Sequence, residues 1–573
     1  MLKKFLKFIL LSVLSFFALI IFFVILAALT MGPHVKENSI LVLDLSGPLM
    51  EQGPKDWKER LLTGEVLTVR GVLSGLDKAR TDKRIKALLV TSLFSEMGPG
   101  KAQELRQAIK NFAAQAKKPV YGFVEEGTTI DYYICSAAPK FYMSPGADSW
   151  FTLVGMRLEI PFFKGTLDKL GIVAQMDHIG QYKSGSEIYT RDTMSDPDRE
   201  ATNSLIDSLF NRITGDIASD RNISQENLKQ MIDHAPFTAS EFKQNHLVDD
   251  LLYQDQVEDM VKKELKLSDV NHIEMLDYQK PTFSESLSDK KNKIAIIYAN
   301  GSIMSGESSH GWGSDVIGST TTGEAFDQAR EDDSVKAVVF RVNSPGGSPS
   351  ASDEIWREVR ITNKKKPVIV SMSDVAASGG YYISMGAARI LADPSTFTGS
   401  IGIYGGKFLT KGLYDKIGMN KEIIKRGEHA DLFSDYVPFS DEEWQLIRKH
   451  MAATYDVFTK KAAEGRKKTQ TQIQEVAQGR VWTGEQALQL GLVDRLGGFK
   501  DALSEAAKLA HLSEKDVGYV VYPSPKGGFS GIFSSSTRDH SFLPHDVAEL
   551  LNWAEITQKE HLILLMPYKF FMN

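Results

Sequence analysis

Val335-Lys-Ala-Val-Val-Phe340 and Ile85-Lys-Ala-Leu-Leu-Val90 are apolar segments of the same design, one in each half of a 573-residue chain. Each follows a similar helical pattern, Phe326-Asp-Gln-Ala-Arg330 in one half and Leu76-Asp-Lys-Ala-Arg80 in the other. Short, nearly continuous apolar runs that alternate with amphipathic stretches are typical of parallel strands covered by helices on both faces. The sequence therefore predicts an α/β fold.

The resemblance between the halves extends over most of the chain. The further matched pairs keep their order: 40–50 with 294–304, Lys118-Pro-Val120 with Lys366-Pro-Val368, Asp131-Tyr-Tyr-Ile134 with Gly380-Tyr-Tyr-Ile383, and His246-Leu-Val-Asp249 with Gly491-Leu-Val-Asp494. A fixed order of matches indicates an internal repeat, which has to be recognised before the fold is assigned. We therefore predict a tandem duplication of one α/β domain.

The repeat also sets the expected domain boundaries. We predict repeat domains at residues 39–278 and 293–523, joined by a polar linker at residues 279–292. Residues 524–573 read as a Gly/Ser-rich loop followed by an apolar tail, Leu562–Met572, that is too short to cross a membrane. Core packing, a subunit contact and a membrane-surface contact all remain open for this tail.

Composition excludes several classes of protein. The formal charge of −6 argues against a nucleic-acid binder, and 42% hydrophobic with 24% charged residues indicates a globular chain. The single cysteine, Cys135, excludes an internal disulfide framework and a cysteine-cluster metal site. We expect no metal and no cofactor.

The amino-terminal segment is far more apolar than the rest of the chain. Residues 1–7 carry Lys3, Lys4 and Lys7, and Phe8–Met31 then contains only three polar residues, which is long enough for a membrane-spanning helix. Positive charge stays in the cytoplasm, so we predict a single-pass anchor with residues 1–7 inside and everything after Gly32 outside. A cleaved signal peptide is the alternative, since Ala27 and Ala28 are compatible with cleavage.

Two glycine-rich segments follow predicted strands in the second half. They are Asn343-Ser-Pro-Gly-Gly-Ser348 and Asp374-Val-Ala-Ala-Ser-Gly-Gly-Tyr-Tyr-Ile383. A serine at such a strand-to-helix turn, Ser378, would lie beside unpaired amides that stabilise an oxyanion, with Gly379 and Gly347 as the natural donors. A tight turn with Ser378 as a plain helix cap explains the same residues.

Comparison of the two halves favours the catalytic interpretation. The first half has about Thr129 at the position of Ser378 and lacks the paired glycines, but it carries Gly180-Gln-Tyr-Lys-Ser184. Lys183 in turn aligns with about Ala430 in the second half. Because each half keeps what the other lacks, we predict one site with serine from the second half and a lysine base from the first. A lysine can act as base when burial lowers its pKa. His429 is the alternative base.

These motifs resemble the signal peptide peptidase A family, also called protease IV, in its long two-repeat bacterial form. The resemblance rests on Gly180–Ser184, Asn343–Gly347, Ala377-Ser-Gly-Gly-Tyr381 and Thr398-Gly-Ser-Ile-Gly402. It implies domains similar to the ClpP/crotonase fold, Ser378 as nucleophile, Lys183 as general base and Ser400 as the serine that orients the lysine.

The resemblance also implies a setting for the protein. It points to a homotetramer in the bacterial inner membrane, with catalytic domains in the periplasm that cut signal-peptide remnants and other apolar peptides. Two rival functions remain: a crotonase-type acyl-CoA enzyme, which leaves Lys183 without a role, and a catalytically inactive membrane scaffold.

Overall fold

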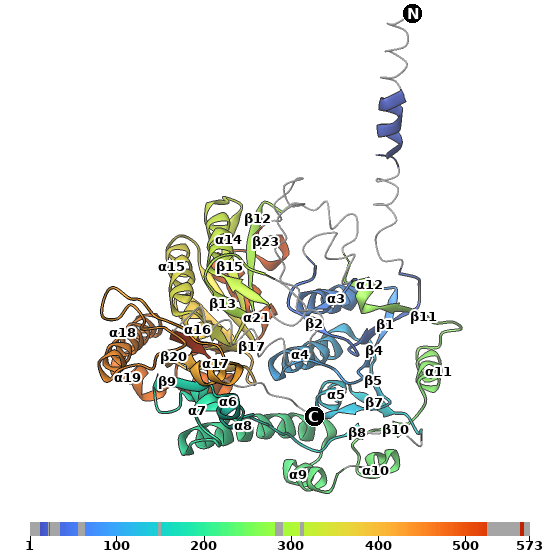
Figure 1. Ribbon diagram of the computed structural model, residues 1–573. Coiled ribbons are helices and arrows are strands. Elements are labelled where there is room, and N and C mark those ends of the chain that lie inside the picture. The colour runs from blue at the N-terminus through green and yellow to red at the C-terminus, as the bar shows by residue number, and fades with distance from the viewer. Residues whose placement is uncertain are drawn as a thin grey trace, which may run out of the picture.

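The computed structural model describes residues 12–20, 22, 35–54, 64–146, 151–235, 237–280, 290–309, 315–523 and 562–566. Within these residues the chain forms two α/β units that lie side by side (Figure 1). The two-repeat α/β prediction is confirmed. The predicted linker lies mostly outside the described residues, and the boundaries at 39–278 and 293–523 remain predictions.

The first unit contains a six-stranded parallel sheet. Its order is β10 (Asp250–Leu251), β7 (Lys140–Met143), β5 (Val120–Val124), β4 (Ile85–Thr91), β1 (Ser39–Asp44) and β11 (Asn271–Glu274). Alternate strand residues pack on opposite faces, since Leu41 and Leu88 belong to one apolar cluster while Ile40 and Leu89 belong to another. Helices α3 (Val69–Thr81), α4 (Pro99–Ala116) and α5 (Thr129–Cys135) cover the first face, and α11 (Gln254–Leu265) covers the second.

The second unit repeats this sheet. Its parallel strands are β12 (Asn292–Asn300), β15 (Val335–Ser344), β17 (Val368–Ala377), β18 (Arg389–Ala392), β22 (Arg495–Leu496) and β23 (Val517–Tyr522). Strands β19 (Phe397–Gly399) and β21 (Val481–Thr483) extend it beside the end of β17. Helices α14 (Ser319–Glu331), α15 (Pro349–Lys365) and α16 (Gly379–Ser384) pack on one face, and α21 (Phe499–Leu509) packs on the other.

Individual contacts are duplicated as well. Tyr132 donates its hydroxyl proton to the carbonyl of Leu247 at 2.6 Å, and Tyr381 donates to Leu492 in the same way at 3.0 Å. The helices α8 (Asp196–Arg221) and α18 (Asp441–Arg466) have equal length, and each starts at a serine cap. The internal repeat inferred from the sequence therefore extends to individual hydrogen bonds that occur at equivalent positions in both units.

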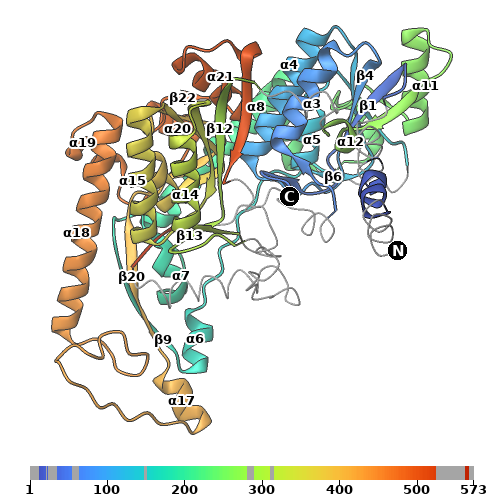
Figure 2. The ribbon, with the colours of Figure 1, turned by 90° about the horizontal axis from the view of Figure 1, so that it is seen from above.

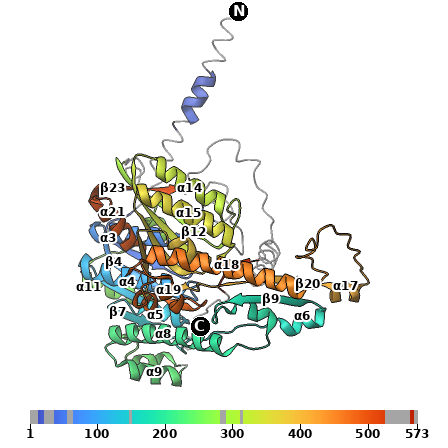
Figure 3. The same cartoon turned by 90° about the vertical axis from the view of Figure 1, so that its left-hand side faces the viewer.

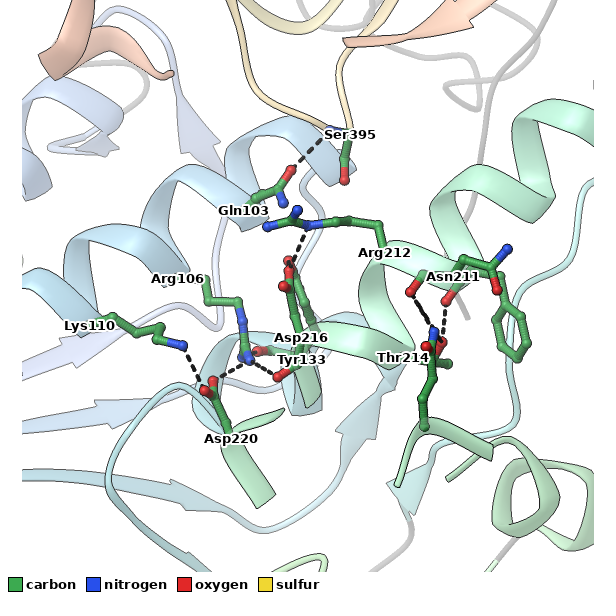
Figure 4. A network of polar contacts seen from close by, with 12 residues as sticks. Gln103, Arg106, Lys110, Tyr133, Asn211, Arg212, Thr214, Asp216, Asp220 and Ser395 are labelled. Atoms are coloured by element: carbon green, nitrogen blue, oxygen red, sulfur yellow. Dashed lines mark hydrogen bonds and ion pairs between the residues drawn. The ribbon is translucent and has the colours of Figure 1, made fainter. Parts of the chain in front are cut away.

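Helix α8 packs against both units. Figure 4 shows α8 attached to the first unit: Lys110 of α4 pairs with Asp220 at 2.6 Å, and Arg106 of α4 pairs with the same carboxylate. Toward its other end, Leu205 and Leu209 of α8 pack with Ala377, Phe397 and Val481 of the second unit. Helix α8 thereby bridges the two repeats.

A third sheet combines strands from both units. Its order is β14 (Val316–Gly318), β13 (Ser302–Met304), β16 (Gly346–Gly347), β24 (Leu562–Leu565), β20 (Ile403–Leu409) and β9 (Val173–Ile179). Strand β9 of the first unit runs antiparallel to β20 of the second, from the pair Ile179 and Ile403 to the pair Val173 and Leu409. Figures 2 and 3 show this ribbon extending from the body of the molecule toward α6 (Lys164–Leu170) and α17 (Lys411–Ile417).

The predicted anchor, Phe8–Met31, lies mostly outside the described residues. Residues 12–20 and Phe22 are helical and exposed. In the part of the chain that the structure describes, no helix combines the length and apolar character needed to span a bilayer.

Candidate active site

Ser378 stands at the junction between β17 and α16. Its backbone has a φ of +55° and a ψ of −111°, outside the regions that non-glycine residues usually occupy. The N–H of Ser378 donates to the carbonyl of Gly399 in the neighbouring β19 at 2.8 Å, and this contact holds the turn. Strained backbone of this kind persists where the surrounding structure enforces it, and it concentrates at functional sites.

The glycines beside Ser378 are packed too tightly to carry side chains. A Cβ on Gly379 would lie 3.0 Å from the nitrogen of Gly347 and 2.8 Å from the hydroxyl of Ser352. A Cβ on Gly346 would lie 2.8 Å from the nitrogen of Gly379. The two predicted oxyanion donors, Gly379 and Gly347, therefore come from different elements but lie close together next to Ser378.

The loop that follows β9 carries Lys183 into the second unit. The N–H of Tyr182 donates to the carbonyl of Gln478 at 2.8 Å. A Cβ on Gly479 would lie 2.5 Å from the Cβ of Lys183, and a Cβ on Gly180 would lie 2.5 Å from the carbonyl carbon of Gln478. The lysine loop and the Gln478–Gly479 segment are thus in backbone contact, which only glycine permits.

The amine of Lys183 lies beside both serines that the sequence analysis singled out, Ser378 and Ser400. Its Nζ lies 2.7 Å from the Oγ of Ser378, 3.0 Å from the Oγ of Ser400 and 3.2 Å from the carbonyl oxygen of Ser400. The lysine is 1% exposed and both serines are fully buried. Burial lowers the pKa of Lys183 well below its usual value, because the charged ammonium loses its hydration.

Ser400 occupies a second constrained turn. It has a φ of +52°, and its N–H donates to the carbonyl of Arg480 at 2.7 Å. Ser400 lies between β19, which anchors the Ser378 turn, and β20, which pairs with the lysine-bearing β9. The short segment around Ser400 therefore connects β19, which holds the Ser378 turn, with β20, which pairs with the strand that precedes Lys183.

The structure brings all five predicted residues, Ser378, Lys183, Ser400, Gly379 and Gly347, into one site. The alternative base, His429, instead faces Glu443 at the start of α18, with 3.5 Å between the Nδ1 and the carboxylate oxygen.

Sequence reasoning missed the residues that support the lysine loop. Gln478 and Gly479 lie shortly before β21 and carry no catalytic signature; the only local signal is the glycine itself, which adopts a left-handed conformation in the structure. Asp198 in the first turn of α8 was also missed. Burial raises its pKa to about 6, although a hydrogen bond from Ser184, the neighbour of Lys183, acts in the opposite direction.

A serine hydroxyl held against a buried amine, with closely packed glycine amides beside it, has the geometry of a serine hydrolase. Comparison with known proteins narrows this class. The family model named Peptidase family S49 matches residues 113–268 and 360–513, once in each repeat. The chain belongs to peptidase family S49 and is a serine protease.

Known serine proteases are similar in sequence to this chain over most of its length. The chloroplastic serine protease SPPA of Arabidopsis thaliana is 33% identical over 507 residues, which is 87% of this chain and 74% of that protein. Protease 4 of Salmonella typhi is 33% identical over 503 residues, covering 84% of this chain and 79% of the relative. A solved structure of a ClpP1 mutant from Listeria monocytogenes is 16% identical, covers 36% of this chain and 93% of that chain, and has a TM-score of 0.24.

Proposed function

We propose that the protein is a membrane-anchored serine endopeptidase with Ser378 as nucleophile and Lys183 as general base. The distance of 2.7 Å between Nζ and Oγ inside a buried site is the observation that carries this proposal. Neutral Lys183 accepts the Oγ proton as Oγ attacks the scissile carbonyl. The N–H groups of Gly379 and Gly347 donate to the resulting oxyanion, and protonated Lys183 returns the proton to the leaving amine.

Water completes the reaction by the same route. Neutral Lys183 removes a proton from water, the hydroxide attacks the acyl-serine ester, and the Oγ of Ser378 regains its proton when the intermediate collapses. Ser400 has a positioning role in this scheme. Its two oxygens lie 3.0 and 3.2 Å from Nζ, so that they fix the amine in one rotamer that faces Ser378.

We infer that the substrates are apolar peptides, with cleaved signal peptides as the main class. Apolar side chains lie near the nucleophile: Phe397, Val481, Leu205 and Leu209 pack with Ala377, which adjoins Ser378. Apolar surroundings of this kind favour an apolar peptide over a charged one.

The membrane setting is proposed from the amino-terminal sequence. Phe8–Met31 would anchor the protein in the bacterial inner membrane, with residues 1–7 cytoplasmic and the catalytic domains in the periplasm. We propose a homotetramer with domains similar to the ClpP/crotonase fold on the resemblance of motifs. Protease protection of inverted membrane vesicles tests the topology, and light scattering of detergent-solubilised protein tests the tetramer.

The catalytic proposal is tested by two substitutions and a matched control. Ser378→Ala and Lys183→Met should each lower kcat/KM for an apolar peptide by at least about 10³-fold, because the nucleophile and its base act as one unit. His429→Ala should retain near-normal turnover. Substantial cleavage by either active-site variant, or loss of cleavage in the histidine variant, contradicts the dyad.

A further inference from the structure

Strand β24, Leu562–Leu565, lies between two strands that carry parts of the active site. On one side it pairs antiparallel with β16, where Leu565 faces Gly346 and Leu564 faces Gly347. On the other side it pairs antiparallel with β20 through Ile563 and Tyr404. The N–H of Met566 donates to the carbonyl of Pro345 at 2.8 Å and extends the pairing by one residue.

The segment 562–566 is buried to the same extent as a core strand. Ile563, Leu564, Leu565 and Met566 are each at most 2% exposed. A Cβ on Gly346 would lie 1.9 Å from the carbonyl oxygen of Leu564, so the two backbones are in direct contact. Glycine at residue 346 is what allows this approach.

The side chains of the segment point into separate apolar sites. Met566 belongs to the cluster that contains Ala377, the neighbour of Ser378, together with Phe397. Ile563 and Leu565 pack with Tyr404 and Met304, whereas Leu564 joins the core of the second unit. Proteins that bind an extended peptide at a sheet edge recognise its alternate side chains in separate pockets in the same way.

A substrate has to use the same place. Its scissile carbonyl must reach Ser378 beside the N–H of Gly347, and an extended peptide there gains main-chain hydrogen bonds from the side of β16 that does not pair with β13. In the structure that edge is paired with Leu564 and Leu565. A peptide that binds through β16 therefore has to displace β24.

We propose that Leu562–Met566 is a resident occupant of the peptide-binding groove between β16 and β20, and that apolar peptide substrates compete with it. This inference rests on the proposed peptidase function and deepens it. A tethered segment acts at a high effective concentration, so it raises the apparent KM of every substrate and leaves kcat unchanged.

The first test uses Leu564→Asp in the full chain. A carboxylate in the fully buried position of Leu564 disfavours docking of the segment, so we expect KM for an apolar peptide to fall by about tenfold at constant kcat. The matched control is Ile424→Asp, which makes the same kind of change at a side chain that is 88% exposed. An unchanged or raised KM in Leu564→Asp overturns the proposal.

The second test needs neither catalysis nor a destabilising variant of the strand. In the Ser378→Ala full chain, we expect slow hydrogen exchange at the amides of 562–566, and faster exchange when the acetylated peptide Leu-Ile-Leu-Leu-Met is added. A peptide with aspartate in the third position should have no effect. Rapid exchange without peptide, or protection that the acetylated peptide leaves unchanged up to its solubility limit, overturns the proposal. Because this readout involves no cleavage, its failure is distinct from failure of the dyad.

Discussion

The central residue is Lys183, whose ammonium group would be costly in its position. The side chain is 1% exposed, and its Nζ is surrounded by hydroxyl and carbonyl oxygens of Ser378 and Ser400. Burial is the cause that lowers its pKa, and in the unfolded chain this pKa returns to its ordinary value. The burial that favours a neutral amine, as the proposed base requires, also reduces the stability of the fold.

The first prediction concerns the pH dependence of cleavage. Only neutral Lys183 accepts the Oγ proton, so kcat/KM should rise with pH through the lowered pKa of Lys183 and be low in acid. The pH profile of kcat/KM for one peptide measures this directly. A flat profile from pH 5 to 9 contradicts the lysine base.

The second prediction concerns the stability of Lys183→Met. Between the lowered pKa of folded Lys183 and the ordinary lysine pKa of about 10.4, the unfolded chain binds one more proton than the folded chain. The free energy of unfolding of the native chain therefore rises with pH in this window, while methionine contributes no such term. We expect Lys183→Met to be more stable than the native chain at neutral pH, by a margin that shrinks toward pH 10 in thermal melts. A pH-independent difference contradicts a neutral buried lysine.

At the scale of elements, the active site depends on the loop between β9 and η1 (Ser184–Ser186). The β9 to β20 ribbon brings this loop across to the second unit, and Gln478–Gly479 fixes it there. No part of the lysine loop belongs to the sheet that carries Ser378. The loop is therefore held by close backbone contact, which a single methyl group can disturb.

The third prediction compares two glycines with similar positive φ angles. Gly479 has a φ of +78° and Gly418 a φ of +74°, but a Cβ on Gly479 meets Lys183 at 2.5 Å, whereas a Cβ on Gly418 meets nothing within 4 Å. Gly479→Ala should lower kcat by about 10²-fold, since a shift of about 1 Å at a catalytic group has that effect.

Gly418→Ala is the matched control for the conformational cost of a non-glycine residue at positive φ. We expect it to lose about 1–2 kcal/mol of stability and to keep its activity. Peptide cleavage and thermal melts of the two variants separate the effect on the Lys183 loop from the conformational cost of alanine at positive φ. Equal activity of the two variants contradicts the importance of the Gly479 contact.

Sequence reasoning predicted the elements better than their partners. The paired matches such as Lys118-Pro-Val120 and Lys366-Pro-Val368 located the strands, because short apolar runs have a strong local signature. The pairing of β9 with β20 was not foreseen. Pairing between distant strands depends on register and on tertiary contacts that no local pattern encodes. The same holds for β24, for which core packing was one of three open alternatives.

At the scale of the whole molecule, a buried ionic cluster joins the two repeats. Arg341 of β15 donates to Glu51 at 2.8 Å and to Glu104 of α4 at 2.8 Å, and its remaining donors reach Ser371 and Ser373. Arg341 is 1% exposed. Burial alone would raise the pKa of Glu51, but the charge of Arg341 holds it below its ordinary value.

The fourth prediction is that Arg341→Leu weakens the junction between the repeats. Removing the guanidinium leaves the buried carboxylates of Glu51 and Glu104 without their direct ion-pair partner, with only the charge of Lys101 acting on Glu51, which should cost about 3–5 kcal/mol. Without Arg341 the pKa of folded Glu51 rises above its unfolded value, so protonation relieves the penalty in acid. We therefore expect the loss of thermal stability to be larger at pH 8 than at pH 5.

Arg495→Leu is the control for loss of an ion pair at the surface. Its side chain is 50% exposed and pairs with Asp501 at 2.6 Å, so the change should cost about 1 kcal/mol or less. Equal thermal shifts in the two arginine variants contradict the importance of the buried cluster.

Duplication supplies an internal comparison that made two residues of the candidate site predictable, whereas Gly379 and Gly347 followed from the glycine-rich turns and Ser400 from the family resemblance. Loss of the serine in one half and of the lysine in the other marked Ser378 and Lys183. The sequence offered no such comparison for Arg341, whose partners lie on the other repeat. Reciprocal loss made the contact between Ser378 and Lys183 predictable across the repeats, whereas Arg341 shows no such pattern and its contacts with Glu51 and Glu104 could not be predicted.

We propose that one active site draws its serine from the second repeat and its base from the first. A double-mutant cycle on kcat/KM with Ser378→Ala, Lys183→Met and the double variant tests this claim most directly. If the two residues act as one unit, all three variants fall to the same low level and the double variant loses nothing further. Losses that multiply in the double variant, or a single variant that keeps substantial activity, contradict a site shared between the repeats.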